Sequence, residues 1–415
     1  MHGRNVVRYF VAIVALLFFL FVSNDFGLID VQKTAIVVAV GIDREEDTFV
    51  VTSQIALPTD GANQTSEIVS RGKTVAEAFE EINDKTGWYP KLVFLKLILL
   101  GENTVNENVF DVLDFFLRDE YVTDDCLVAV CDGITKDFLN VQTPTNGVSA
   151  LAIAGVLSSH AERVGAVMPN TLREFAASSF GDSKSGYLPV IKLALPQEQI
   201  GGEGESDPKG QPPSESSGGG GNGNSKGAGS SSSGSSSSKT SSQNAEERVF
   251  SVSETALFFE GKQVGSLDKK QTFAFSTVMS ELRLATYTVP YRNASYTLTV
   301  KHTSPSIKLK IEKNGAVKLK IGVSLTAGVA DFSHSDTENE VKDVGDVPKG
   351  LLNAAETALK AEIERTVESA KACGSDVFGA TDLLKKYENK YFNAFKKDIF
   401  ERANVEVSVK FKSVR

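Results

Sequence analysis

The sequence contains few of the residues that build disulfide frameworks and metal centres. It has 3 cysteines and 4 histidines among 415 residues. An odd and small number of cysteines excludes a disulfide framework. Cys126 and Cys131 lie five positions apart in the apolar run CLVAVC, which predicts a strand. Since residues at an odd spacing on a strand point to opposite faces, we expect two buried thiols that do not bond to each other.

Catalytic signatures are also missing. No glycine-rich phosphate loop and no nucleophile elbow occurs at a strand-to-helix turn. The acidic stretches 43–47 and 118–125 lack the ligand spacing of a calcium loop. No histidine stands four positions from another or beside a metal-spaced carboxylate; the four are His2, His160, His302 and His334. We therefore expect no enzyme, no metal site and no cofactor.

Basic residues are fewer than acidic residues in this chain. The chain has 53 acidic residues against 44 lysines and arginines, a net charge of -9. A nucleic-acid-binding chain would carry a basic face, and adhesion to anionic lipid would need a polybasic run. No such run occurs outside the extreme N-terminus. The composition therefore predicts no nucleic-acid partner.

The longest apolar run lies near the start of the chain. Tyr9–Val22 comprises fourteen apolar residues preceded by Arg4 and Arg8. A helix of that length spans roughly 21 Å, so crossing the ~30 Å hydrocarbon core would also need Phe26–Ile29. The arginines place the N-terminus in the cytoplasm and the rest outside, and no A-x-A-like cleavage site follows. A retained membrane helix over 1–29 is favoured over a cleaved signal or a buried core helix.

Residues 30–133 are expected to form an α+β domain with its helices packed on one side of a sheet. Apolar alternation predicts strands, and three- and four-residue spacing predicts helices. The expected order is strand 35–40, strand 49–57, polar loop 59–72, helix 74–87, strand 91–101, helix 106–119 and strand 125–133.

Residues 134–290 are expected to form a middle α+β domain. Its predicted elements are helices at 147–164 and 170–181, a strand at 185–195 and a hairpin at 248–267 that turns at Gly261. The stretch 201–245 consists mainly of Gly, Ser, Asn, Pro and charged residues, so it should be disordered. A long surface loop within this domain is favoured over a linker between two domains.

Residues 291–415 are expected to form a C-terminal α+β domain, a meander with a long helix across it. Its elements are alternating strands over 294–332 with a type I′ turn at Asn314-Gly315, helices at 349–374 and 382–395, and a strand at 404–411. The overall prediction is three mixed sheet-and-helix domains after an N-terminal membrane helix.

Five segments, taken in order, resemble the Ger(x)C family, the C subunits of bacterial spore germinant receptors. They are LIDVQKTAIVVAVGID with Gly41 and Asp43, FVVTSQIALP, the block from FLKLILLG to VAVCDG with Arg118 and Asp119, the hairpin ETALFFEGKQVGSL with Gly265, and ACGSDVFGA with Asp376, Phe378 and Gly379. The resemblance extends over nearly the whole chain from Ile29.

Three features depart from that family pattern. The family usually begins with a lipobox cysteine after the apolar run, whereas FLFVSNDFG has none. Lipid anchoring is therefore not expected, and the retained helix would replace it. The Gly/Ser-rich stretch is unusual in content, although it falls between the two halves of the family pattern. The C-terminal segment from Lys390 lacks the tryptophans of the family.

The resemblance implies a non-enzymatic, membrane-tethered, extracytoplasmic subunit. It would lie on the outer face of the inner spore membrane, beside integral-membrane A- and B-type subunits, and contribute to the response to nutrients. The matching motif positions are expected to be structural, and no ligand-contacting residue is assigned. A general extracytoplasmic module for cell-wall glycan or a solute, and a hydrolase with an unrecognised site, are the alternatives.

Overall fold

A computed structural model describes residues 11–16, 18, 34–56, 65–141, 148–157, 163–194, 249–333 and 347–414. The expected membrane helix lies outside the described residues except for 11–16 and 18, which are helical, and the expected disordered stretch 201–245 lies wholly outside them. In the described part of the chain, no helix combines the length and apolar content needed to cross a bilayer.

Nine strands of the described chain form one mixed sheet in the order β3-β2-β1-β5-β6-β7-β8-β9, with β4 beside β1. Neighbouring strands among β1, β5, β6 and β7 are parallel, and antiparallel hairpins extend the sheet at both edges. The bounds are β1 Thr34–Glu45, β2 Thr48–Ala56, β3 Thr65–Gly72, β4 Tyr89–Lys91, β5 Leu97–Leu100, β6 Leu127–Cys131, β7 Ser185–Ala194, β8 Val249–Phe259 and β9 Lys262–Leu267.

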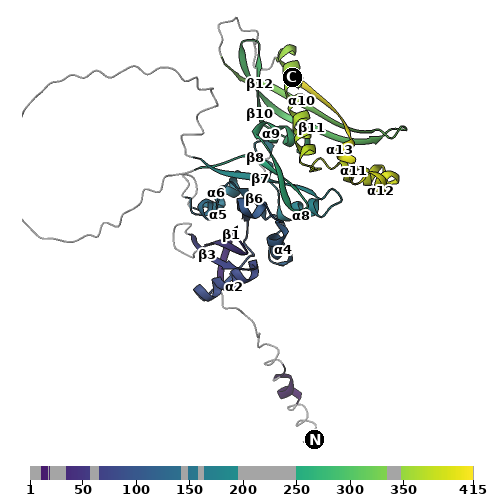
Figure 1. Cartoon of the computed structure of the whole chain (residues 1–415). Coiled ribbons are helices and arrows are strands. Elements are labelled where there is room, and N and C mark those ends of the chain that lie inside the picture. Colours follow the sequence, from purple (N-terminus) through teal and green to yellow (C-terminus); the bar gives the residue numbers. More distant parts are fainter. Residues whose placement is uncertain are drawn as a thin grey trace, which may run out of the picture.

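Helices cover both faces of this sheet (Figure 1). The predicted helices α2 (Val75–Thr86) and α4 (Phe110–Arg118) pack on the same face together with α8 (Leu172–Ser179), which confirms their expected placement on one side. The opposite face is covered by α5 (Thr135–Leu139) and α6 (Ser149–Val156). Because both faces are covered, the central strands carry unbroken apolar runs such as LILL in β5.

The two cysteines of β6 and its lead-in behave as expected. Cys126 belongs to the core on the α2 face, whereas Cys131 belongs to the core on the α5 face. Both are free thiols and buried. Burial raises the pKa of the Cys126 thiol to about 12 and raises that of Cys131 as well.

A second sheet has the order β10-β11-β12-β13. The strands are β10 (Ala285–Tyr291), β11 (Ala294–Ile311), β12 (Val317–Phe332) and β13 (Asn404–Ser413). The first three form an antiparallel meander, but β13 lies parallel to β12, so the expected simple meander is wrong for the last strand. The helices α9 (Lys269–Met279) and α10 (Lys349–Ala372) bury one face of this sheet.

Other sequence predictions need correction. Residues 65–72 form β3 rather than a loop; this edge strand has few apolar residues to reveal it. The turn at Asn314-Gly315 places only Gly315 at positive φ, 82°, so it is not type I′. The helix expected over 382–395 is broken into α11 (Ala380–Tyr387), η3 (Asn389–Tyr391) and α12 (Phe392–Phe395), with α13 (Ile399–Arg402) after them.

The long helix α10 follows its prediction closely. Leu351, Ala355, Leu359, Ile363 and Val367 repeat every four residues and are buried against the second sheet. The helix is followed by Gly374, whose φ of 68° lies in the left-handed region that ends helices.

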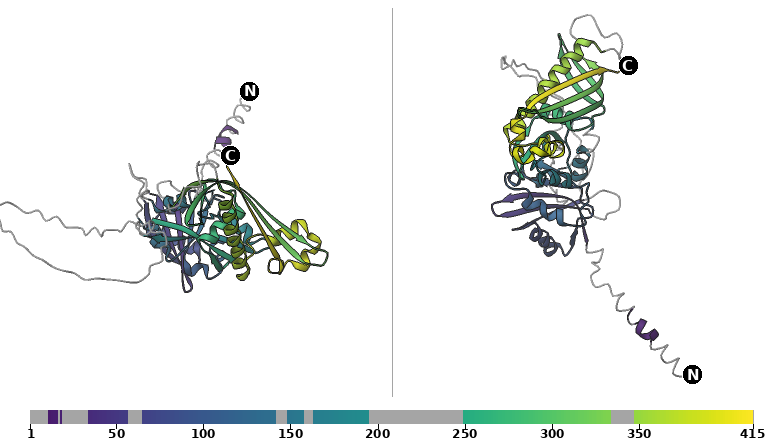
Figure 2. Two further views of the ribbon diagram at one scale, coloured as in Figure 1. Left: turned by 90° about the horizontal axis from the view of Figure 1, so that it is seen from above. Right: turned by 90° about the vertical axis from the view of Figure 1, so that its right-hand side faces the viewer.

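The two sheets lie at opposite ends of the molecule. Figures 1 and 2 show β1–β3 and α2 at one end and the second sheet with α10 at the other. The boundary predicted at 133/134 falls within the larger sheet, between β6 and α5, and the boundary at 290/291 falls within β10. The division into three domains stays a prediction.

Candidate functional site

Asp43, at the carboxyl end of β1, is tied to the start of α5. One carboxylate oxygen, Oδ2, accepts a 2.6 Å hydrogen bond from Thr135 Oγ1. The backbone N–H of Thr135 also donates to the carboxylate, at 3.1 and 3.2 Å to the two oxygens. This is the arrangement in which a carboxylate satisfies an unpaired amide at a helix N-terminus. Burial raises the pKa of Asp43, and its hydrogen bonds from Thr135 oppose that rise.

Gly41 makes this contact sterically possible. A Cβ atom at position 41 would lie 2.3 Å from Thr135 Oγ1 and 3.2 Å from a methyl carbon of Leu139. Any side chain on this residue would therefore push α5 away from the sheet. A surface cavity of about 480 Å³ lies beside it, lined by Asp43 together with charged groups that include Arg44, Glu102 and Lys136.

Asp376 occupies a second junction, between the larger sheet and the C-terminal elements. Its carboxylate accepts hydrogen bonds from the N–H groups of Ala380 at 2.8 Å and Thr381 at 2.7 Å, the first turn of α11. Its own N–H donates to Ser185 Oγ on β7 at 2.8 Å. Burial raises the pKa of Asp376 to about 6, although the hydrogen bonds from Thr381 and Ala380 lower it.

Phe378 and Gly379 complete the same motif. Phe378 is buried, with its ring edge-on to Phe275 of α9 at a centroid distance of 5.4 Å. Gly379 has a φ of 70°, and it is the residue from which α11 begins. Because that conformation disfavours residues with a Cβ, the glycine fixes the turn between α10 and α11.

Gly265 of β9 belongs to the same junction through α10. A Cβ atom at position 265 would lie 2.3 Å from Cys373 Sγ, at the end of that helix. Ser375, two residues further on, donates from its hydroxyl to the carbonyl oxygen of Phe258 at 2.9 Å. Two motif segments that are far apart in sequence therefore meet where α10 ends against β8 and β9.

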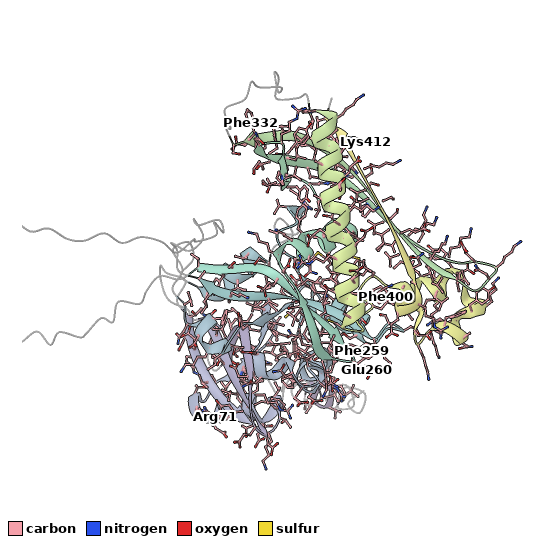
Figure 3. All side chains as sticks on the ribbon, turned by 45° about the horizontal axis from the view of Figure 1, so that its top comes forward. Arg71, Phe259, Glu260, Phe332, Phe400 and Lys412 are labelled. Atoms are coloured by element: carbon pink, nitrogen blue, oxygen red, sulfur yellow. The ribbon has the colours of Figure 1, made fainter. Side chains whose placement is uncertain are left out.

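A cavity of about 460 Å³, which we name the junction cavity, opens at this meeting point. Figure 3 shows Phe259 and Glu260 beside Phe400, where α10 approaches the larger sheet. Its lining residues are Gly181, Asp182, Ser183, Lys184, Phe259, Glu260, Gly374, Asp376, Thr381 and residues 396–401.

Several charged residues around the junction cavity form ion pairs. Lys184 contacts Glu260 at 2.5 Å, and Lys385 contacts Asp182 at the same distance. Asp398 Oδ2 accepts from Arg402 at 2.6 Å, whereas Oδ1 is buried with no hydrogen-bond partner among the described residues. The cavity can accept a small polar molecule. The ion pairs and hydrogen bonds around it, however, chiefly hold the C-terminal elements to the larger sheet.

The remaining motif positions lie elsewhere. Arg118 is an exposed residue at the end of α4, 2.7 Å from Asp114, and Asp119 accepts a hydrogen bond from the N–H of Tyr121 at 2.8 Å. Neither is joined to the junction cavity or to the Asp43 contact. In the described ranges, no group of three His, Cys, Asp or Glu side chains is placed to hold a metal ion.

Sequence reasoning missed the partners of the motif carboxylates. Thr135 and Ser185 are each hydrogen-bonded to a motif residue, at sequence separations of 92 and 191. Threonine and serine are common at helix starts and strands, so nothing in a single sequence distinguishes these two. Lys184 and Asp398 of the junction cavity lie in none of the motif segments, so no sequence pattern indicated them either.

The chain matches known protein families over both of its halves. Residues 28–193 match the family described as spore germination protein N-terminal domain, and residues 253–415 match the family described as spore germination B3/GerAC like, C-terminal. No curated protein sequence matches the chain. The stretch between the two matched regions contains the Gly/Ser-rich residues.

A solved structure has a similar fold. The crystal structure of the GerBC protein superposes with a TM-score of 0.50 at 17% sequence identity, over 90% of this chain and 96% of that chain. The shared fold and the two ordered matches confirm the resemblance carried by the motifs around Asp43 and Asp376. The chain therefore belongs to the Ger(x)C family of spore germination proteins.

Proposed function

We propose that the chain is the C-type subunit of a nutrient germinant receptor. It acts in spore germination as a non-catalytic, extracytoplasmic protein beside integral-membrane A- and B-type subunits. The observation that carries the proposal is the ordered match of both family halves, 28–193 and 253–415, on one α+β fold.

The proposed tether is the apolar run Tyr9–Val22. It comes after Arg4 and Arg8, the charge pattern that keeps an N-terminus cytoplasmic and exports the rest of the chain. Since FLFVSNDFG contains no cysteine to acylate, the run itself would hold the protein on the outer face of the inner spore membrane. The end of the fold that carries β1 would then be the end nearest the bilayer (Figure 1).

The geometry around Asp43 and Asp376 supports a structural role for the motif positions. Both carboxylates cap helix starts, and Gly41 and Gly265 allow close packing. A subunit that passes a signal between partners needs a defined shape rather than a reactive group. The motif residues would supply that shape by fixing α5 against the larger sheet and α11 against β7.

Germination of spores in a strain with a single receptor operon tests the proposal. Removing this gene should abolish the nutrient-triggered loss of optical density, and the wild-type gene should restore it. A strain with one operon is needed because paralogous receptors would mask the loss. Unchanged germination, together with thermal stabilisation of the purified chain by muropeptides, would instead favour a general wall-glycan module.

A further inference from the structure

The outer face of the second sheet carries a cluster of lysines that we name the lysine face. On this face Lys310 lies opposite Lys318, and Lys308 lies opposite Lys320, in two successive rows across β11 and β12. Two further lysines stand on the same face of β13, Lys410 opposite Ser324 and Lys412 opposite Thr326. All are exposed except Lys318, which is half-buried.

Acidic side chains balance only part of this charge. Glu406 contacts Lys318 at 3.3 Å and Lys320 at 3.1 Å, and Glu312 contacts Lys318 at 2.8 Å. Among the described residues, no carboxylate lies within ion-pair distance of the other four lysines, which are Lys308, Lys310, Lys410 and Lys412. The face is thus strongly basic on a chain whose net charge is -9.

The arrangement is unfavourable for the isolated fold. Like charges directly opposite each other on neighbouring strands destabilise a sheet, and here two such rows are consecutive. An anion lying across the rows would remove that repulsion. Without such an anion, the lysine rows do not stabilise the fold.

Small residues occupy the centre of the face. The row between the two groups of lysines is Ser306, Gly322 and Ser408, and the next row contains Ser304 and Ser324. A bound chain could therefore approach the strands closely here, with lysines on either side. From the row of Lys318 to the row of Thr326 the strand advances eight residues, about 27 Å, which is far longer than a small nutrient.

We propose that the lysine face binds an acidic polypeptide segment of a partner protein. An extended segment of about eight residues spans the face from the row of Lys318 to the row of Thr326 and so reaches both groups of lysines. Carboxylates at alternate positions of that segment would face the sheet at nearly the same repeat as the lysine rows.

Other polyanions fit the face less well. The five rows from Lys310 to Lys412 contain no arginine, so they lack the fork that recognises phosphate in bidentate fashion. They also contain no phenylalanine, tyrosine or tryptophan on which nucleotide bases could stack. A bilayer is disfavoured because the face belongs to the end of the molecule opposite β1, from which the proposed tether leads (Figure 2); this last step alone rests on the proposed function.

Binding of a labelled peptide to the full-length chain in detergent tests the proposal. The probe is a peptide of alternating Glu and Ser, about 12 residues long, and its control has Gln in place of Glu. The Glu peptide should bind, more weakly at about 0.5 M than at about 0.05 M NaCl, and the Gln peptide should not. The double variant K308E/K410E should weaken binding of the Glu peptide by about tenfold or more.

The matched control is K269E/K270E, which makes the same change of charge at two exposed lysines of α9. It should bind as the wild type does, and the thermal unfolding of both variants should show that each is folded. Equal loss in both double variants would show that only net charge matters and would overturn the proposal. Two results would overturn the choice of a polypeptide. One is that inorganic polyphosphate displaces the Glu peptide at a lower concentration of negative charge than the peptide itself supplies. The other is that anionic vesicles bind through the same lysines.

Discussion

The N–H of Asp376 donates a 2.8 Å hydrogen bond to the hydroxyl of Ser185, a residue 191 positions earlier in the chain. Through this contact the turn between α10 and α11 is fastened to β7. The carboxylate of the same aspartate caps α11, so one residue fixes both a helix start and its position on the larger sheet.

Replacing Asp376 by asparagine should change how stability depends on pH. Burial raises the pKa of Asp376 from 3.8 to about 6 in the folded state, so folding favours the protonated form. The contribution of Asp376 to the free energy of unfolding is therefore present below pH 3.8. It is lost as the pH rises toward 6, by up to about 3 kcal/mol. Urea unfolding of wild type and D376N at several pH values should show the wild type losing stability relative to the variant over that window.

D125N provides the control for this measurement, because Asp125 is exposed and its hydrogen bond from Lys96 lowers its pKa. The wild type should lose no stability relative to this variant over the same pH window, because a lowered pKa keeps the contribution of Asp125 present above pH 3.8. A wild-type advantage over D376N that grows as the pH rises would contradict the assigned burial of Asp376.

Substitution of Gly265 by alanine should destabilise the junction. The new methyl group would lie 2.3 Å from Cys373 Sγ, and crowding of this kind costs about 1–3 kcal/mol of unfolding free energy. Removing the sulfur should relieve the clash, so G265A/C373A should be more stable than the sum of the single effects predicts. Strict additivity of G265A and C373A in urea unfolding would show that the two residues do not touch.

The hydroxyl of Thr135 should matter more than its methyl group. T135V removes the 2.6 Å hydrogen bond to the half-buried Asp43 carboxylate, which should cost about 1–3 kcal/mol at neutral pH. T135S keeps the hydroxyl and should cost less. Burial raises the pKa of Asp43. The loss of unfolding free energy in T135V comes from the ionised carboxylate, so it should shrink when Asp43 is protonated at acidic pH. A penalty that is the same for T135V and T135S would mean that packing, not the hydrogen bond, holds α5.

Reversing one charge on the lysine face should stabilise the second sheet. In K308E the new carboxylate stands opposite Lys320, so repulsion becomes attraction and unfolding free energy should rise by about 0.2–1 kcal/mol at low salt. The neutral variant K308Q should gain less. About 1 M NaCl should remove most of the difference between them, since exposed charges are then screened. K308E that is less stable than wild type at low salt would show that the two lysines do not repel each other.

Strong periodic patterns made parts of the fold predictable. The four-residue repeat from Leu351 to Val367 located α10, and the apolar runs around Leu97–Leu100 and Leu127–Cys131 located β5 and β6. Weakly patterned elements were missed. The strand β3 has only Ile68 and Val69 as larger apolar residues, and α9 mixes polar and apolar residues around its whole circumference.

The sites were less predictable than the fold. The motifs contained Asp43 and Asp376, but their partners Thr135 and Ser185 depend on contacts across 92 and 191 positions. The lysine face was hidden for another reason. Its six lysines alternate with buried residues on three strands, so no continuous basic run appears in the sequence. Only strand pairing brings them together.

Purification of the chain from spore membranes tests the central claim most directly. A tag after Arg415 leaves the N-terminal run intact, and detergent extracts of dormant spores supply the partners. We predict that the full-length chain, with residues 1–29 retained, appears in the membrane fraction and co-purifies with the A- and B-type receptor subunits. A full-length chain in the soluble fraction without either subunit would contradict the proposed function.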